Sequence, residues 1–173
     1  MMIIWITGIS GSGKTTTANF LLNKLRKAHS NLVNLDGDII RNLYDDDLGY
    51  DVNSRIKQIK RIQKLCSFLE SQGLIVIVSA LYADETLLRW NRRNFKKYLE
   101  VYLDASIDLV KKRDPKNIYK KYFLGEEKNI VGIDIEWNVP INPDIKIEMN
   151  ENTSLEEIGN LIYNKIKYLY KSN

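Results

Sequence analysis

Apolar stretches and helical patterns alternate along the chain, and this alternation is typical of a parallel α/β sheet. The apolar stretches predict strands at 3–7, 32–35, 74–79, 99–103 and 144–148. Apolar residues recur at helical spacing over about 14–28, 52–72, 84–97, 104–112 and 154–170. The stretch at 74–78 is apolar at every position, which implies that both faces of the sheet are buried. We therefore expect an α/β fold of three layers, with helices on both sides of the sheet.

The length and composition predict one domain over residues 1–173. The chain has 44% hydrophobic and 28% charged residues, enough for one sizeable core, and it shows no internal repeat or linker. No apolar stretch approaches the roughly 18 residues that span a membrane, and the first residues resemble a strand more than a signal peptide. The single cysteine, Cys66, cannot form an internal disulfide, which fits a reducing cytoplasm. Its place on an apolar helical stripe with Ile62 and Leu69 predicts a buried thiol.

The net charge of +4 and the pI near 9.0 suit a protein that attracts anions such as nucleotides. Much of the excess lies in Lys and Arg runs at 57–64 and 111–121 and in lysines close to the C-terminus. Such runs are usually the solvated faces of helices. They argue against sequence-specific recognition of nucleic acid.

The pattern G-x4-G-K-T occurs intact at residues 8–15, after an expected strand and before a helical pattern, which is the setting of a phosphate-binding loop. Glycines let backbone N–H groups curl around phosphate oxygens. Lys14 can bridge the β- and γ-phosphates, and the Thr15 hydroxyl can bind Mg²⁺. A glycine-rich turn with an accidental Lys-Thr is the simpler alternative, but the flanking strand and helix favour the functional interpretation. The residues expected at ATP are Gly8, Ser10, Gly11, Ser12, Gly13, Lys14, Thr15 and Thr16.

A phosphate loop also occurs in switches and motors, and other features argue against both. A guanine-specific switch would carry an Asn-Lys-x-Asp element. Asn-Lys occurs at 23–24 and 164–165, and in neither place does the Asp follow. A motor or transporter module would need more chain than 173 residues to couple ATP use to a partner. The pattern therefore favours an ATP-dependent kinase.

Two acidic residues, Asp36 and Asp38, follow the second expected strand, with Arg41 one turn further on. Lys14, Asp36 and Tyr82 each follow a strand, and the carboxyl ends of parallel strands meet at one edge of a sheet. Asp36 can position or deprotonate an incoming hydroxyl or hold Mg²⁺, Asp38 can accept hydrogen bonds from a second substrate, and Arg41 can pair with its phosphate. The structural alternative makes Asp38 a helix N-cap and leaves Arg41 on the surface. Behind an intact phosphate loop, the functional interpretation is favoured.

Taken together, these segments resemble the adenylylsulfate kinase family, whose members phosphorylate the ribose 3′-hydroxyl of adenosine 5′-phosphosulfate. The matching segments are GISGSGKTT at 8–16, LDGDIIR at 35–41, DLGYDVNSRIKQIKRI at 47–62, EVYLDASIDLVKKRDPKNIYKKY at 100–122 and NIVGIDIEWNVPINPD at 129–144. They cover nearly the whole chain in the family's order and spacing. The resemblance implies a P-loop kinase fold, a parallel sheet of order 2-3-1-4-5, and a mobile lid over ATP at about 113–131.

The resemblance also assigns roles to single residues. Lys14 and Asp36 are the expected catalytic residues, and Thr15 and Asp36 are the expected ligands of Mg²⁺. Arg113 joins the residues at ATP. The expected acceptor contacts are Asp38, Arg41, Tyr50, Arg55, Gln58, Leu81, Lys116 and Ile130.

Departures from the family pattern cluster on the acceptor side. Gln58 replaces an Asn, the residues at 79–81 replace Ile-Ser-Pro, and Ile130 replaces a Phe that stacks on the acceptor adenine. The loss of that ring removes a stacking surface worth about 1–3 kcal/mol per base, by analogy with single-strand binders. The sequence therefore favours another acceptor base, as in the family's relative, the cytidine diphosphoramidate kinase of bacterial capsule phosphoramidate synthesis.

Two alternatives stay open. An adenylylsulfate kinase that has drifted within its family would make 3′-phosphoadenylylsulfate from adenosine phosphosulfate. A polynucleotide kinase, or a non-catalytic nucleotide-binding module, is the competing class. For either small-molecule kinase, ATP and Mg²⁺ are the cofactors, a nucleotide is the acceptor, and a homodimer is an open oligomeric state.

Overall fold

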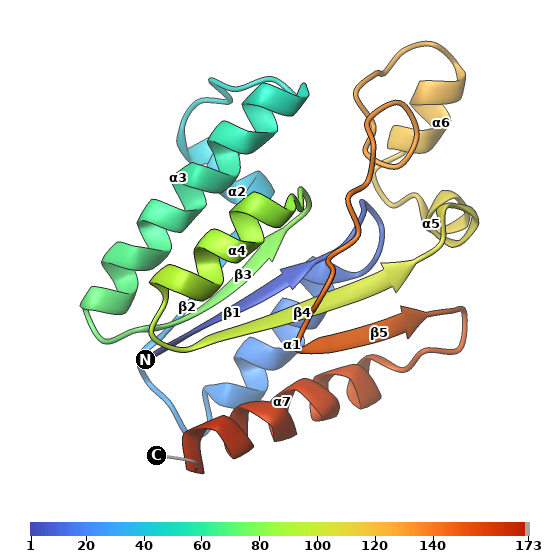
Figure 1. Cartoon of the computed structure of the whole chain (residues 1–173). Coiled ribbons are helices and arrows are strands. Elements are labelled where there is room, and N and C mark those ends of the chain that lie inside the picture. Colours follow the sequence, from blue (N-terminus) through green and yellow to red (C-terminus); the bar gives the residue numbers. More distant parts are fainter. Residues whose placement is uncertain (172–173) are drawn as a thin grey trace.

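An all-parallel sheet runs through the middle of the molecule (Figure 1). The computed structural model describes residues 1–171, and the side chains of residues 1–169. Its strands are β1 Met2–Thr7, β2 Leu32–Asp36, β3 Ile75–Ala80, β4 Tyr98–Ala105 and β5 Ile145–Met149. Their order is β2-β3-β1-β4-β5, which confirms the expected fold class and strand order. Residues 172 and 173 of the expected domain lie outside the described residues.

Helices cover both faces of the sheet and give the expected three layers (Figure 1). They are α1 Lys14–Leu25, α2 Gly37–Leu43, α3 Val52–Ser71, α4 Glu85–Asn94, α5 Ile107–Arg113, α6 Ile118–Phe123 and α7 Leu155–Lys171. Element ends differ from the expected ones by a few residues. For example, β4 continues to Ala105 because this residue still pairs with Met149 of β5, and Ser106 then caps α5.

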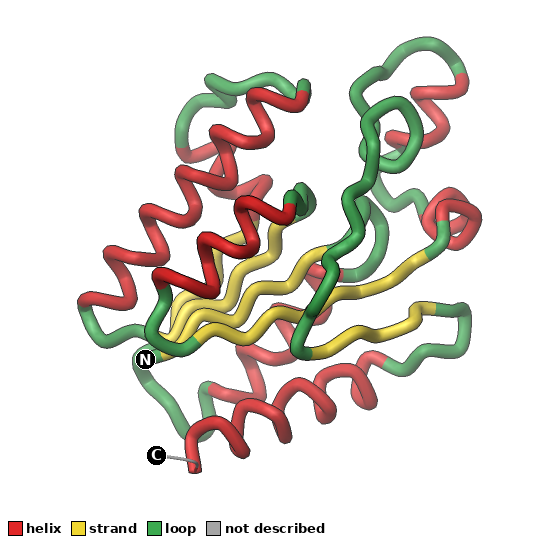
Figure 2. The backbone as a smooth tube through the Cα atoms, in the orientation of Figure 1, coloured by secondary structure: helices red, strands yellow, loops and turns green. Residues whose placement is uncertain are grey.

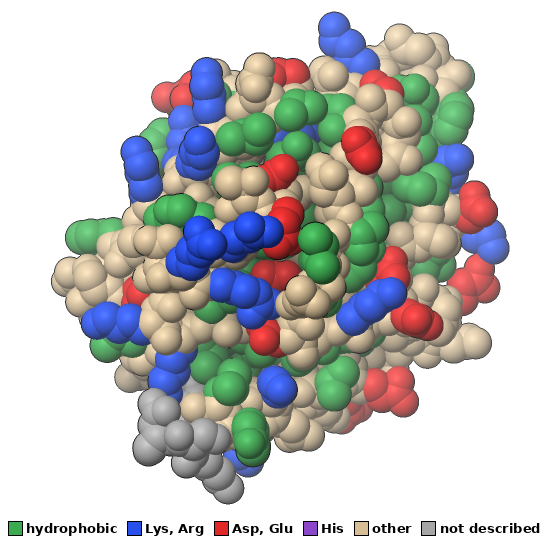
Figure 3. All heavy atoms as spheres, in the orientation of Figure 1, with side chains coloured by type: hydrophobic (Ala, Val, Ile, Leu, Met, Phe, Trp, Pro, Cys, Tyr) green, Lys and Arg blue, Asp and Glu red, His purple; other side chains and the backbone are tan. Residues whose placement is uncertain are grey.

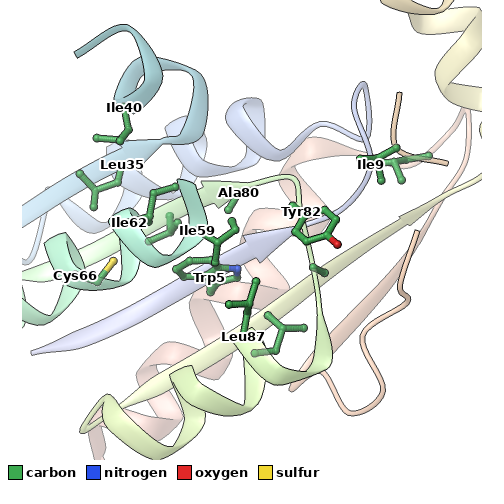
Figure 4. Packing of buried hydrophobic residues seen from close by; sticks show 14 of the residues in the cluster. Trp5, Ile9, Leu35, Ile40, Ile59, Ile62, Cys66, Ala80, Tyr82 and Leu87 are labelled. Carbon is green, nitrogen blue, oxygen red and sulfur yellow. The ribbon is translucent and has the colours of Figure 1, made fainter. Parts of the chain in front are cut away.

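Strand β1 is buried along its whole length, and its side chains alternate between two cores. On one face, Trp5 packs with Ile62 and Cys66 of α3 (Figure 4). Ile3 belongs to the same core. Burial raises the pKa of the Cys66 thiol, so this side chain is a packing group, as expected. The same core also includes residues of α4, α5 and α6.

On the opposite face, Ile4 and Ile6 pack against helices α1 and α7. These two helices approach closely at Gly159 of α7, where a Cβ atom would overlap the ring of Phe20. Lys24 of α1 adds a cation–π contact on each helix, with Nζ 5.8 Å from the ring centroid of Phe20 and 5.0 Å from that of Tyr163. Helix α7 therefore depends on a glycine for its position beside α1.

The carboxyl ends of all five strands lie at one edge of the sheet, where connecting loops gather (Figure 2). The loop at 8–13 follows β1, Asp36 ends β2, and the loop at 81–84 follows β3. A long segment without helices or strands, 124–144, then leads from α6 back to the start of β5 (Figure 2). Polar groups from distant parts of the chain therefore meet at this edge.

We expect the substitution Gly159→Ala to destabilise the fold by about 1–3 kcal/mol, although Ala ordinarily favours a helix interior by about 1 kcal/mol. The reason is that the new methyl group would meet the ring of Phe20. Urea unfolding of Gly159→Ala, Phe20→Ala and the double variant measures this, and in the Phe20→Ala background Gly159→Ala should become neutral or stabilising. A single Gly159→Ala variant that is more stable than wild type would show that the ring moves aside freely.

Candidate active site

The loop at 8–13 connects β1 to α1 and leaves the first turn of α1 open. Gly13 precedes α1 with φ 99°, a conformation that favours glycine, and no side chain caps the helix. Gly8 also cannot carry a side chain, because a Cβ atom there would lie 2.7 Å from the carbonyl oxygen of Leu103. The start of a helix with free N–H groups attracts phosphate. The loop therefore has the local structure that its sequence pattern predicts.

Of the two residues after Gly13, Lys14 contacts the loop itself and Thr15 contacts the end of β2. Lys14 Nζ donates to the carbonyl oxygen of Ile9 at 2.8 Å, and Thr15 Oγ1 donates to Asp36 Oδ2 at 2.6 Å. Burial lowers the pKa of Lys14 to about 8, in spite of nearby carboxylates. Lys14 is therefore a charged group that gains from an anionic partner.

A cavity of about 700 Å³ extends from this loop to α2, α3 and residues 129–131. All the residues expected at ATP or at the acceptor line it, except two: Gly8 and Ser12. Both residues are buried. Their expected contact with ATP stays a prediction, whereas the other expected residues come together from distant parts of the chain.

Asp36 and Asp38 occupy different environments. Asp36 is 6% exposed and caps α2, its Oδ1 atom accepting from the N–H of Asp38 at 3.0 Å. The structural alternative placed this cap at Asp38. The cap is Asp36 instead, because that residue still has the extended backbone of β2. The Asp38 side chain is exposed and forms an ion pair with Lys116 of the expected lid.

Arg41 and Arg55 lie buried beside the cavity, with exposed fractions of 6% and 8%. Arg41 is thus not the surface residue of the structural alternative. Burial, and then the charge of Arg41, lower the pKa of Arg55. Carbonyl groups hold both guanidinium groups: those of Leu48 and Gly49 (both 2.9 Å) for Arg41, and those of Tyr50 and Asn129 (both 2.7 Å) for Arg55.

Neither arginine forms an ion pair with any residue in the described part of the chain. Tyr50 covers both, with its ring centroid 4.6 Å from Cζ of Arg41 and 5.6 Å from Cζ of Arg55. Two like charges that are buried without a counter-ion are unfavourable until an anion binds. This part of the cavity therefore suits an acceptor with anionic groups.

Ile130 and Gln58 complete the walls on the acceptor side. Ile130 is 6% exposed, and the Asp134 carboxylate fixes its loop by accepting hydrogen bonds from the N–H groups of Asn129 and Ile130. Gln58 is buried, and its Nε2 donates to the carbonyl oxygen of Gly37 at 3.1 Å, which ties α3 to α2. The wall at residue 130 is therefore aliphatic and held in place.

The expected lid at about 113–131 contacts the phosphate loop. Tyr119 of α6 is buried, and its hydroxyl donates to the carbonyl oxygen of Ser10 at 3.0 Å. Arg113, at the end of α5, donates to the carbonyl oxygen of Asn150 at 3.0 Å. The motion of this segment stays a prediction.

Sequence reasoning expected Tyr82 at this edge of the sheet without a specific role, and it missed other residues that line the cavity, including Met149 and Thr153. Tyr82 follows β3 and Met149 ends β5, so the rule that ligands collect beyond strand ends points to both. Strand β5 has only five residues with alternating burial, which made its end hard to locate from apolar content. Met149 and Thr153 reach the phosphate-loop end of the cavity from this strand and the turn after it.

The phosphate loop, the strand order and the cavity beyond the strand ends define a P-loop kinase fold. The family model for adenylylsulphate kinase matches residues 1–148. The chain belongs to the adenylylsulphate kinase family, and it is an ATP-dependent phosphotransferase that acts on a hydroxyl group. The expected family and enzyme class are thus confirmed.

Individual relatives are similar over almost the whole chain. An adenylyl-sulfate kinase of Marinobacter nauticus is 36% identical over 174 residues, which span 99% of this chain and 87% of the relative. A cytidine diphosphoramidate kinase of Campylobacter jejuni is 37% identical over 164 residues, 95% of each chain. Mycobacterium tuberculosis APS kinase, whose structure is known in complex with AMPPNP and APS, has 30% sequence identity to this chain. The two structures superpose with a TM-score of 0.87 over 96% of this chain and 97% of that one. The chain is thus about equally similar to kinases named for two different acceptors.

The helices in residues 1–171 include none that is long and apolar enough to cross a membrane.

We expect ATP binding to take up a proton at about pH 9 and much less at about pH 6, because the pKa of Lys14 in the free protein is about 8. Bound phosphate favours the charged ammonium group, so it raises this pKa, and affinity for ATP should weaken as the pH rises above 8. Calorimetric titration in two buffers of different ionisation enthalpy measures the uptake. The variant Lys14→Arg stays charged and serves as the control, and equal uptake in both proteins would contradict the assignment to Lys14.

Proposed function

We propose that this chain transfers the γ-phosphoryl group of ATP to the ribose 3′-hydroxyl of a small nucleotide. One observation carries the proposal: one cavity has the phosphate loop at one end and, at the other, two buried arginines that form no ion pair with a described residue. A nucleotide whose 5′ phosphoryl groups pair with Arg41 and Arg55 would direct its ribose toward Asp36 and the loop. We take residues 1–173 as one kinase domain and 113–131 as its lid.

In this proposal the residues along the cavity have separate tasks. Lys14 and the first N–H groups of α1 bind phosphate oxygens of ATP. Asp36, which is buried beside Thr15, accepts a hydrogen bond from the acceptor hydroxyl and orients it or takes its proton. Asp38 and Lys116 connect α2 to the lid and limit the entry of water. These tasks fit an in-line transfer to an alcohol.

Thr15 and Asp36 fit a magnesium ion. Their oxygen atoms are 2.6 Å apart at the end of the phosphate loop, and both atoms suit a hard cation. No group of three or more His, Cys, Asp or Glu side chains within residues 1–171 could hold a metal. Mg²⁺ in kinases typically uses only one or two protein ligands together with phosphate and water. When bound, this ion would neutralise charge on the phosphoryl group.

Among acceptors we place cytidine diphosphoramidate first. The aliphatic wall at Ile130 supports this choice, because it offers no aromatic surface where the family stacks an adenine. The similarity to the Campylobacter jejuni kinase supports it as well. Adenosine phosphosulfate is the alternative, supported by the adenylyl-sulfate kinase relatives and by the aromatic ring of Tyr50 at the cavity.

Asn substitutions should separate the roles of the two acidic residues. We expect Asp36→Asn to lower kcat by about 100-fold or more, because it removes the charge nearest to the acceptor hydroxyl. Asp38→Asn should mainly raise the KM of the acceptor, because that carboxylate lies at the exposed pair with Lys116. Steady-state kinetics with both substrates varied measures this, and Lys116→Met serves as a matched variant for the pair. A dominant kcat effect at Asp38 with little effect at Asp36 would show that the roles are exchanged.

The acceptor is tested with labelled ATP and a panel of nucleotides. We expect cytidine diphosphoramidate to exceed adenosine phosphosulfate in kcat/KM by about tenfold to several-hundredfold, from about 1–3 kcal/mol per misplaced contact. Ile130→Phe should narrow the gap by restoring a stacking surface, and Ile130→Leu is the control that keeps an aliphatic wall.

The other outcomes of this acceptor panel identify a different acceptor or contradict the proposed function. A tenfold preference for adenosine phosphosulfate would establish the ordinary adenylylsulfate kinase. Label transferred only to oligonucleotide ends would identify a polynucleotide kinase. No transfer to any acceptor would contradict the proposed function.

A further inference from the structure

Tyr82, in the loop between β3 and α4, lines the cavity with a hydroxyl group that has no hydrogen-bond partner among the described residues. The residue is 7% exposed and its ring packs in the core beside Trp5. Figure 4 shows the hydroxyl oxygen on the side of the ring that faces away from Trp5. The hydroxyl groups of Tyr98, Tyr102 and Tyr119 have partners within the protein. The Tyr82 hydroxyl instead opens to the cavity, where a bound ligand can become its partner.

The charged groups around Tyr82 indicate what reaches this hydroxyl. Arg55 is the cationic neighbour, and Asp84 and Glu136 are the acidic ones. The Asp84 carboxylate is engaged at the start of α4, where it accepts from the N–H groups of Thr86 and Leu87. Tyr82 thus lines the same cavity as Arg55, one of the two arginines that would pair with the phosphoryl groups of the acceptor. Burial raises the pKa of Tyr82, so the phenol is neutral at pH 7.

Arginine and tyrosine differ in the hydrogen bonds that they can make. Arg41 and Arg55 can only donate, so they suit phosphoryl or sulfuryl oxygens but cannot satisfy an N–H group. A neutral tyrosine hydroxyl can donate and also accept. Among the other neutral acceptor side chains there, Gln58 already accepts through Oε1 from Arg61 at 3.2 Å, and Tyr50 is 49% exposed, so water can serve its hydroxyl. Tyr82 is therefore a buried neutral acceptor that can serve an N–H group placed beside the arginines.

We propose that Tyr82 is a specificity-determining residue, whose oxygen accepts a hydrogen bond from an N–H group on the distal phosphorus of the acceptor. The inference rests on the proposed function and deepens it, because it assigns recognition of the distal group to one side chain. If that phosphorus carries only oxygen atoms, the arginines can donate hydrogen bonds to all of them, and binding of the acceptor depends less on Tyr82. The distal group does not react, so Tyr82 acts on binding of the acceptor.

The test is Tyr82→Phe with four acceptors: the 5′-diphosphoramidates and the 5′-diphosphates of cytidine and adenosine. We expect kcat/KM for both diphosphoramidates to fall about tenfold, mainly through KM, because a buried N–H group loses its partner. Both diphosphates should lose less than about threefold, because arginine donors can serve the same oxygens. The change should thus follow the distal group and not the base.

A stability measurement separates this role from a structural one. Tyr82→Phe removes no hydrogen bond among the described residues, so its Tm should match that of wild type. Tyr102→Phe is the matched control outside the cavity. Its hydroxyl donates to Asp104 at 2.7 Å and accepts from Trp137 at 3.3 Å, so this variant should lower the Tm and leave the acceptor preference unchanged.

The other outcomes overturn the inference. Equal losses on all four acceptors, or a change that follows cytosine against adenine, would show that Tyr82 does not read the distal group. Wild-type protein that phosphorylates none of the four would instead contradict the proposed function itself, which is visible before any variant is made.

Discussion

Burial of β1 on both faces is the constraint on which the rest of the structure depends. The strand lies between β3 and β4, and all six of its residues are buried, so it has no solvated face for polar groups. The polar residues that follow the strands are therefore placed beyond the strand ends. Because the five strands are parallel, those ends coincide, and Lys14, Asp36 and Tyr82 meet there although they are far apart in the chain.

In the free protein, two buried positive charges on the acceptor side of the cavity repel each other. Arg41 and Arg55 are fixed by backbone carbonyl groups and have no carboxylate partner in the described chain. Carbonyl groups orient a guanidinium group without neutralising it, so the positive potential is preserved for a ligand. On the face in Figure 3, Lys and Arg side chains gather over α4 but are interspersed with acidic and uncharged groups. The net charge is thus a weaker guide to function than two buried residues.

The sequence could predict the layers and the phosphate loop because these depend on strong local signals, whereas the strand order and most acceptor contacts were implied by the resemblance to a known family. A strand that is apolar at every position and an intact phosphate-loop pattern need no knowledge of the neighbours. Features that depend on packing could not be predicted in this way. Gly8 and Ser12 are buried although they belong to the loop pattern, and Asp36 caps α2 because β2 extends to that residue. The unpartnered hydroxyl of Tyr82 depends on a packing arrangement that no local pattern records.

The buried cysteine of the first core has a practical consequence. Cys66 is 0% exposed, its thiol resists ionisation, and it is the one cysteine in the sequence. Thiol reagents should therefore leave the folded wild-type protein unlabelled. A cysteine introduced at an exposed position such as Phe123 of α6 would be the one reactive thiol, and Cys66 would not need to be replaced. A fluorophore or spin label there could follow the segment over the phosphate loop during turnover, in a protein otherwise unaltered.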